Sequence, residues 1–200
     1  MKRQLTKNLQ KYTKHMSKMS KLRDVSINPT SVENLNLSKS EDLICKNLMC
    51  EKLGEVCICK LARWASINGP SLDNLQALEL ENNGLTVLPD SVFDLNQIEY
   101  LNLSHNLLTE FPIGIIRLQN LKILDLSHNK LIGNLPTYIQ TMTYDDDDDN
   151  DDGTVLLEHA NDSILPKLET IYVHNNDDLI IENNDNWEYD NENGIVFRLL

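Results

Sequence analysis

This 200-residue sequence has little of what marks several other protein classes. Aromatic residues make up only 6%, and no apolar run approaches the roughly 20 residues that a membrane-spanning helix needs. The N-terminal residues contain no apolar stretch of the secretory type, so we expect neither a membrane protein nor a secreted one. What remains, 40% hydrophobic and 24% charged, is the composition of a globular protein of about one domain.

Motifs for catalysis and nucleotide binding are also missing. The sequence has seven glycines, no Gly-rich phosphate loop, no G-x-S-x-G nucleophile elbow and no H-E-x-x-H zinc motif. We therefore predict a protein that is not an enzyme and binds no cofactor. Two of the five histidines, His105 and His128, occur in the same phrase, Leu-Ser-His-Asn, and we interpret them as structural.

Charge is distributed unevenly along the chain. Residues 1–23 contain eight Lys or Arg and no acidic residue, whereas the rest of the chain carries a net charge of −21, which gives −13 in total. Because nucleic acids need clustered basic residues on the binding face, we expect no nucleic-acid partner. A protein partner with a basic character suits the body of the chain better.

Four cysteines occur close together, at Cys45, Cys50, Cys57 and Cys59. Without a secretory signal, reduced thiols are expected. Their spacing, C-x4-C-x6-C-x-C, is not the C-x2-C pair of zinc knuckles and ribbons. We interpret them as small buried apolar residues in the first turns of the domain. The alternative interpretation is a metal site, which we do not predict.

An internal repeat dominates the middle of the chain. A pattern of five apolar or Asn positions, L-x-x-L-x-L-x-x-N-x-L, starts at residues 75, 98 and 121, so that the period is 23 residues. The three copies consist of Leu75, Leu78, Leu80, Asn83 and Leu85; of Ile98, Leu101, Leu103, Asn106 and Leu108; and of Leu121, Leu124, Leu126, Asn129 and Leu131. A Leu-Pro or Phe-Pro pair follows each copy, as in Leu88–Pro89.

This pattern resembles the leucine-rich repeat family. The fourth and sixth positions alternate as on a strand and point to one face, which stacked units bury in one continuous core. The fold class is therefore expected to be an α/β leucine-rich repeat solenoid, with a short curved parallel β-sheet and irregular or helical convex limbs. The resemblance also implies a structural ladder of asparagines, formed by Asn83, Asn106, Asn129 and Asn176.

A fourth unit comes after a gap. It comprises Leu168, Ile171, Val173 and Asn176, with Leu179 one place late. The gap contains 23 extra residues, the length of one repeat, but a decayed repeat would place Asp147 and Asp149 at inward positions, which is costly. We instead predict an acidic inserted loop at 143–163, where seven Asp occupy residues 145–152.

Upstream the pattern weakens. Units starting at Val32 and at Leu53 each match three of five positions, so we predict two degenerate repeats that form a cap over 30–74. The segment Leu61–Trp64 also looks helical and is able to pack beneath the first clear repeat. The predicted organisation is an N-terminal extension at 1–29 and a repeat domain at 30–200, with clear repeats at 75–142 and a last repeat and C-terminal cap at 164–200.

The two ends have separate interpretations. Within 1–29, apolar residues recur every three or four positions from Leu5 to Leu22 on a basic segment, which predicts an amphipathic helix. It would serve as a cap, a partner-binding helix, a mitochondrial presequence or a membrane-surface helix. The apolar segment at 194–200 is expected to form a final strand.

Function is expected on the sheet face that points away from the leucines. We predict a monomeric protein-binding or scaffolding module that acts in signalling. We expect it in the cytoplasm or, alternatively, in mitochondria or the nucleus. The alternatives are a regulatory subunit of a phosphatase or GTPase, and an acidic chaperone-like binder of basic proteins. Tyr100, Ile123 and Tyr172 are expected to be exposed among carboxylates and to act as three anchors of a contact patch. The predicted binding residues are Glu79, Glu81, Tyr100, Asn102, Ile123, Asp125, Tyr172 and His174.

Overall fold

A computed structural model of the chain describes residues 29–45, 48–49, 51, 54, 56–136, 165–180, 187–190 and 194–197. The helix predicted within 1–29 and the acidic loop predicted at 143–163 lie outside these residues.

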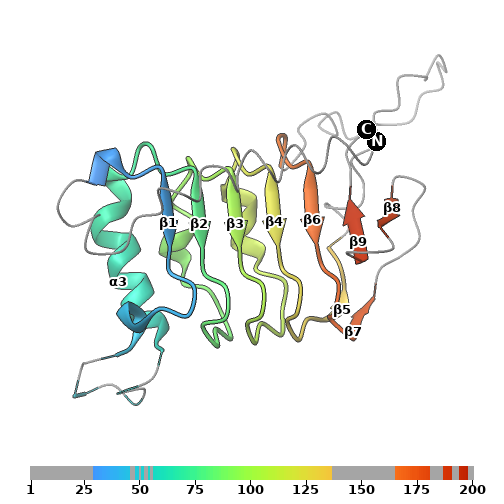
Figure 1. Cartoon of the computed structure of the whole chain (residues 1–200), viewed down its shortest axis with the longest axis horizontal. Coiled ribbons are helices and arrows are strands. Elements are labelled where there is room, and N and C mark those ends of the chain that lie inside the picture. The colour runs from blue at the N-terminus through green and yellow to red at the C-terminus, as the bar shows by residue number, and fades with distance from the viewer. Residues whose placement is uncertain are drawn as a thin grey trace, which may run out of the picture.

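Short parallel strands lie side by side in one sheet (Figure 1). Successive strands pair in register, so that Leu78 lies beside Leu101 and Leu101 beside Leu124. Seven strands form this sheet in the order β1-β2-β3-β4-β6-β9-β8. The five parallel ones are β1 (Asn34–Asn36), β2 (Ala77–Glu79), β3 (Tyr100–Asn102), β4 (Ile123–Asp125) and β6 (Thr170–Tyr172).

The repeated leucines form a single core behind the sheet. Leu78, Leu101, Leu124 and Ile171, at the central position of four strands, are each 0% exposed and belong to one cluster that runs from Val32 to Val173. No unit could bury these side chains alone, because each strand is only three residues long and is covered by the units on either side. The predicted leucine-rich repeat solenoid is confirmed.

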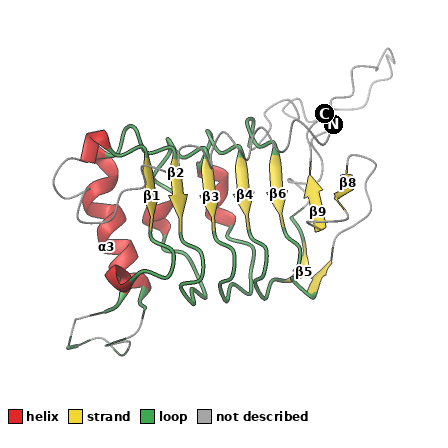
Figure 2. Ribbon diagram, viewed as in Figure 1, coloured by secondary structure: helices red, strands yellow, loops and turns green. Residues whose placement is uncertain are grey.

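The chain returns from one strand to the next through turns on one side of the sheet (Figure 2). Two of these limbs contain 3-10 helices, η5 (Asp90–Val92) and η6 (Ile113–Arg117), and each helix comes directly after a proline. Their inward residues, Val92 and Ile115, are 0% exposed and complete the core opposite the strands. The pairs Leu88–Pro89 and Phe111–Pro112 therefore mark where these two limbs turn back over the core.

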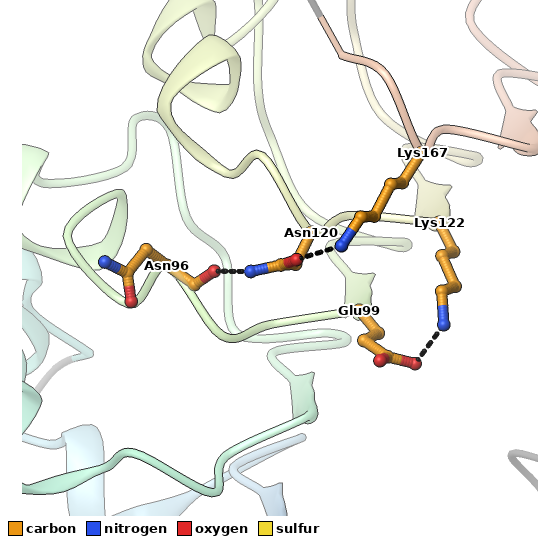
Figure 3. A network of polar contacts seen from close by, with 5 residues as sticks. All are labelled: Asn96, Glu99, Asn120, Lys122 and Lys167. Atoms are coloured by element: carbon orange, nitrogen blue, oxygen red, sulfur yellow. Dashed lines mark hydrogen bonds and ion pairs between the residues drawn. The ribbon is translucent and has the colours of Figure 1, made fainter.

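Polar side chains tie neighbouring units together before the strands begin (Figure 3). Asn120 donates a hydrogen bond from Nδ2 to the backbone oxygen of Asn96 at 2.8 Å and accepts one from Lys167 Nζ at 2.6 Å. Nearby, Lys122 Nζ lies 2.7 Å from Glu99 Oε2. Each contact joins residues about one repeat apart in space, so these contacts hold successive coils in register. They are partly exposed and each adds little stability on its own.

The N-terminal region differs from the prediction of two degenerate repeats. The unit at Val32 does supply a strand, β1, but β1 pairs directly with β2, and no strand forms at the unit predicted from Leu53 among the residues described there. Helix α3 (Ile58–Asn68) begins there instead and lies beside β1 (Figure 1). Short 3-10 helices occur at η2 (Pro29–Ser31), η3 (Glu41–Leu43) and η4 (Gly69–Ser71).

Helical spacing explains why α3 replaces the predicted repeat. Leu61, Trp64 and Ala65 recur at three and four residues, which places them on one helix face. They are 0%, 7% and 2% exposed and join the leucine core. The helix predicted at Leu61–Trp64 is thus present and covers the N-terminal part of the core.

The C-terminal end of the sheet changes direction. Strand β9 (Gly194–Phe197) runs antiparallel to β6, and β8 (Trp187–Asp190) runs antiparallel to β9. A second, two-stranded parallel sheet is formed by β5 (Ile132–Asn134) and β7 (Asp178–Ile180). None of the helices in the described part of the chain has the length and apolar character that a membrane crossing requires.

Candidate functional site

The candidate site is the face of β1, β2, β3, β4 and β6 that points away from the leucine core, here called the outer sheet face. Strand alternation places the third, fifth and seventh positions of each repeat on this face. The register aligns them in rows across the sheet. The third-position row is Asn34, Ala77, Tyr100, Ile123 and Thr170, the fifth is Asn36, Glu79, Asn102, Asp125 and Tyr172, and the seventh is Ser38, Glu81, Ser104, Ser127 and His174.

Several of these side chains are less exposed than the sequence led us to expect. Ile123 is 2% and Tyr172 7% exposed, while Tyr100 is half-buried and packs against both. Adjacent strands are only about 4.8 Å apart, so large side chains on neighbouring strands cover one another. The prediction of three exposed anchors is wrong for Ile123 and Tyr172, which form a small apolar cluster with Tyr100.

Three of the five repeats use their fifth and seventh positions for a local structural motif. In one, Asn102 Oδ1 accepts hydrogen bonds from the Ser104 N–H at 2.9 Å and from its Oγ at 2.7 Å. Asp125 Oδ1 does the same for Ser127, at 2.9 and 2.6 Å. Asn36 likewise accepts from the backbone N–H two residues ahead, at 2.8 Å. Such contacts give a partner to backbone N–H groups where the strand ends. Asn102 and Asp125 therefore have a structural role. The sequence already shows the Asx-x-Ser spacing that makes these contacts possible.

The two other repeats break this motif. One has Glu79 and Glu81 at these positions, and the other has Tyr172 and His174. Burial raises the pKa of the Glu79 carboxyl, and the charge of Glu81 raises this pKa further. Asn36 Nδ2 donates a hydrogen bond to Glu79 Oε2 at 3.1 Å. The pair therefore concentrates negative charge where other repeats carry a self-contained polar turn.

The apolar cluster lies close to this charge. The pKa of Tyr100 is raised, first by burial and then by the nearby carboxylates of Glu79 and Asp125. Its hydroxyl therefore stays protonated at neutral pH. None of the third, fifth or seventh positions of the five parallel strands is Lys or Arg. The outer sheet face thus presents partly exposed aromatic surface next to carboxylates.

Residues with a left-handed backbone conformation form a row along the outer sheet face, where the strands end. The residue after the seventh position has a positive φ in all five repeats, from 49° to 56°. These residues are Lys39, Asn82, His105, His128 and Asn175. The rings of His105 and His128 stack with centroids 4.1 Å apart, and His128 contacts His174 edge to face at 5.2 Å. Asn and His tolerate this backbone conformation better than most side chains, which agrees with a structural role for the two histidines.

The predicted ladder asparagines lie just beyond, at the ninth position. Asn106 Nδ2 donates to the carbonyls of Leu80 and Leu103, both at 2.9 Å, while its Oδ1 accepts from the backbone of the preceding unit. The Nδ2 atoms of Asn83, Asn129 and Asn176 donate to carbonyls in the equivalent way, and the three residues are between 4% and 8% exposed. These side chains satisfy backbone groups that would otherwise be buried without partners.

The cysteines follow the sequence interpretation only in part. Cys45 and Cys57 are buried, but Cys59, the second residue of α3, is exposed. Cys50 lies outside the described residues. A hydrogen bond with Cys57, together with desolvation, raises the pKa of Cys59 to about 12. Cys59 is therefore a protonated thiol at neutral pH and not an activated nucleophile.

A comparison with known proteins agrees with the repeat pattern. Residues 73–131 match the family model described as "Leucine rich repeat". A solved leucine-rich repeat protein of Leptospira interrogans aligns with 83% of this chain at 25% sequence identity and a TM-score of 0.44. The alignment covers 40% of that protein, so this chain spans less than half of its length. No curated protein matches the sequence.

Proposed function

We propose, from the premise that this chain belongs to the leucine-rich repeat family, that it is a non-catalytic protein-binding module. Domains of this family generally bind proteins, and their function depends on the surface rather than on the scaffold. The proposed binding surface is the outer sheet face, and the proposed partner is a protein that brings a basic residue and an apolar side chain together.

One observation supports this surface above others. In three repeats the fifth-position Asn or Asp accepts a hydrogen bond from the backbone N–H of the seventh-position Ser, whereas the repeats with Glu79–Glu81 and Tyr172–His174 have no Asn or Asp there. The scaffold gains nothing obvious from two adjacent carboxylates, since burial and mutual repulsion both disfavour their charged forms. A cation from a partner would relieve this repulsion, and the half-buried ring of Tyr100 would supply an adjacent apolar contact.

The partner is best trapped from this face directly. A photo-crosslinking amino acid replacing Glu81 should capture a partner that the same amino acid replacing Glu110 does not. Glu110 is exposed and lies on a returning limb, outside the strands. Mass spectrometry then identifies the captured protein and its crosslinked residue.

A charge-reversal pair tests the role of the carboxylates. E81K should weaken binding of the captured protein by at least about tenfold, because a like-charge contact costs more than about 1.4 kcal/mol. E110K changes the net charge by the same amount and should bind as the natural chain does. Equal affinities of E81K and the natural chain, or equal losses in both variants, would refute the proposal.

Ionic strength separates the alternatives. An acidic chaperone-like binder should lose its partner above physiological salt, because its contacts are screened. A scaffold that also uses the Tyr100 cluster should retain most of its affinity. The remaining parts of the proposal, which rest on the sequence, are a monomer, a cytoplasmic location and a repeat domain that begins at residue 30.

A further inference from the structure

All four cysteines of the chain fall between residues 45 and 59, and the fold brings together the three that the structure describes. The Sγ atoms of Cys45, Cys57 and Cys59 lie within 4.8 Å of one another. Cys59 Sγ is 2.8 Å from Cys57 Sγ and 3.9 Å from Cys45 Sγ. This cluster is not part of the outer sheet face, so a role for its thiols is independent of the proposed binding function.

Local backbone pairing places the first two thiols on neighbouring chain segments. Ile44 forms an antiparallel bridge with Val56. Beside it, the Cys57 N–H donates to the Leu43 carbonyl at 3.1 Å. Cys45 therefore lies across from the segment that leads into Cys57, although the two are 12 residues apart in sequence.

The start of a helix brings in the third thiol. Cys57 is the N-cap of α3, and Cys59 is the second residue of that helix. The first backbone N–H groups of a helix have no partners within the helix and carry partial positive charge. They would therefore offset part of the negative charge that the sulfur atoms gain when a metal displaces their protons. The helix of 11 residues thus presents two sulfur atoms at its positive end, facing the sulfur of Cys45.

We propose that Cys45, Cys57 and Cys59 form a three-thiolate zinc site. Zinc binds thiolates at about 2.3 Å with tetrahedral geometry, which corresponds to sulfur atoms roughly 3.8 Å apart. The distance between the Sγ atoms of Cys45 and Cys59, 3.9 Å, matches this value. A side-chain rotation that moves the Cys57 Sγ by about 1 Å would bring it to the same distance from Cys59 Sγ. The fourth position lies on the surface side, where Cys59 is exposed.

The donor atoms favour zinc over other common cations. Magnesium and calcium prefer oxygen ligands, whereas thiolates select soft or borderline ions such as zinc. In a reducing compartment, clustered cysteines indicate metal binding more often than a disulfide. This inference replaces the sequence-based expectation of no metal site. Its structural consequence is that the metal would join the segment ending at Cys45 to helix α3, whose Leu61 and Trp64 cover the N-terminal part of the core.

Metal titration of the reduced full chain tests the site. We expect one equivalent of Zn²⁺ in competition with a chromophoric chelator, and one equivalent of Co²⁺ with a thiolate-to-cobalt charge-transfer band. C59S is the informative variant, because Cys59 is exposed and its loss leaves the core intact. It should weaken Zn²⁺ binding by more than about 100-fold, beyond what the loss of a supporting contact costs. R63S, on an exposed position of the same helix, is the matched control and should bind as the natural chain does.

A second measurement needs no variant. Zn²⁺ should protect the thiols of Cys45, Cys57 and Cys59 from alkylation in the natural chain, as read by peptide mass spectrometry. C50S keeps all three thiols and should retain stoichiometric binding. Natural-chain affinity in C59S, binding lost in C50S but kept in C59S, or alkylation of the three thiols that is unaffected by Zn²⁺ would each overturn the assignment.

Discussion

Replacing Asn106 with alanine should destabilise the protein about twice as much as the same change at Asn129. Both side chains are buried, at 3% and 8% exposure, and occupy the same position of successive repeats. They differ in what their oxygen atoms accept. Asn106 Oδ1 accepts from the N–H groups of Asn83 and Leu85, each at 3.0 Å. Among the described residues, Asn129 Oδ1 accepts from one N–H, that of Leu108, at 3.1 Å.

The carbonyls on the donor side contribute less to the difference. Leu80 O also accepts from Asn83 Nδ2, and Leu103 O accepts from both Asn106 and Asn129, all at 2.9 Å. Either truncation therefore leaves these carbonyls with a second donor. The cost comes from orphaned amides, at about 1–3 kcal/mol for each buried N–H, which gives about 2–6 kcal/mol for N106A and about 1–3 kcal/mol for N129A.

Urea unfolding followed by circular dichroism measures both free energies. The comparison holds where the variants keep the m-value of the natural chain, which shows that the same surface is exposed on unfolding. N96A is the control, because Asn96 is exposed and the variant should stay within about 0.5 kcal/mol. A loss in N129A equal to or larger than that in N106A would show that the ladder does not work through these amides.

Two further predictions concern stability. A Cβ on Gly114 would overlap the buried ring of Phe93, so G114A should cost about 1–3 kcal/mol in a thermal or urea melt, and an unchanged melt would contradict this packing. Burial lowers the pKa of His174 below 6.5, as does the charge of His128, although Asp125 opposes them. Near and below pH 6.5 the unfolded chain therefore binds more protons at His174 than the folded chain does. The contribution of neutral His174 to stability should be complete above about pH 6.5 and be lost as the pH falls through the lower pKa of the folded state. H174Q should flatten this pH dependence in melts.

The repeat period predicted the sheet correctly because it constrains every strand at once. A spacing of 23 residues between Leu78, Leu101 and Leu124 requires the three to occupy the same place in successive coils. A slip by one residue would have moved every leucine to the outer face. The observed register pairs these residues directly, so the fold follows from the sequence.

The prediction failed where few positions carried it. The unit proposed from Leu53 relied on three apolar positions. The spacing of the apolar residues from Ile58 to Ala65 also fits the periodicity of a helix. Without the ladder Asn, nothing in the pattern requires a strand there. Cys57 is still extended, with φ −137° and ψ 129°, but the helix begins at the next residue. Spacing over a few residues does not separate a short buried strand from the first turn of a helix.

Exposure on the outer sheet face could not be read from alternation. Alternation indicates which side of the sheet a residue faces, whereas its exposure depends on the size of its neighbours on adjacent strands. Ile123 lies between Tyr100 and Thr170 in its row and is 2% exposed. The repeat period predicts that these residues are neighbours, but only the structure shows how far their side chains cover one another.

The same rows show how a scaffold and a binding surface can be separated within one repeated structure. Where a position repeats its chemistry, as in Asn102–Ser104 and Asp125–Ser127, the hydrogen bonds that it makes already explain it. Where it departs, as at Glu79, burial and a neighbouring carboxylate disfavour the charge, and one hydrogen bond from Asn36 offsets this in part. Three other repeats carry Asn or Asp at this fifth position, followed by Ser at the seventh, and the repeat with Glu79 does not. The departure is therefore the better guide to recognition, and the first place where a charge reversal should be made.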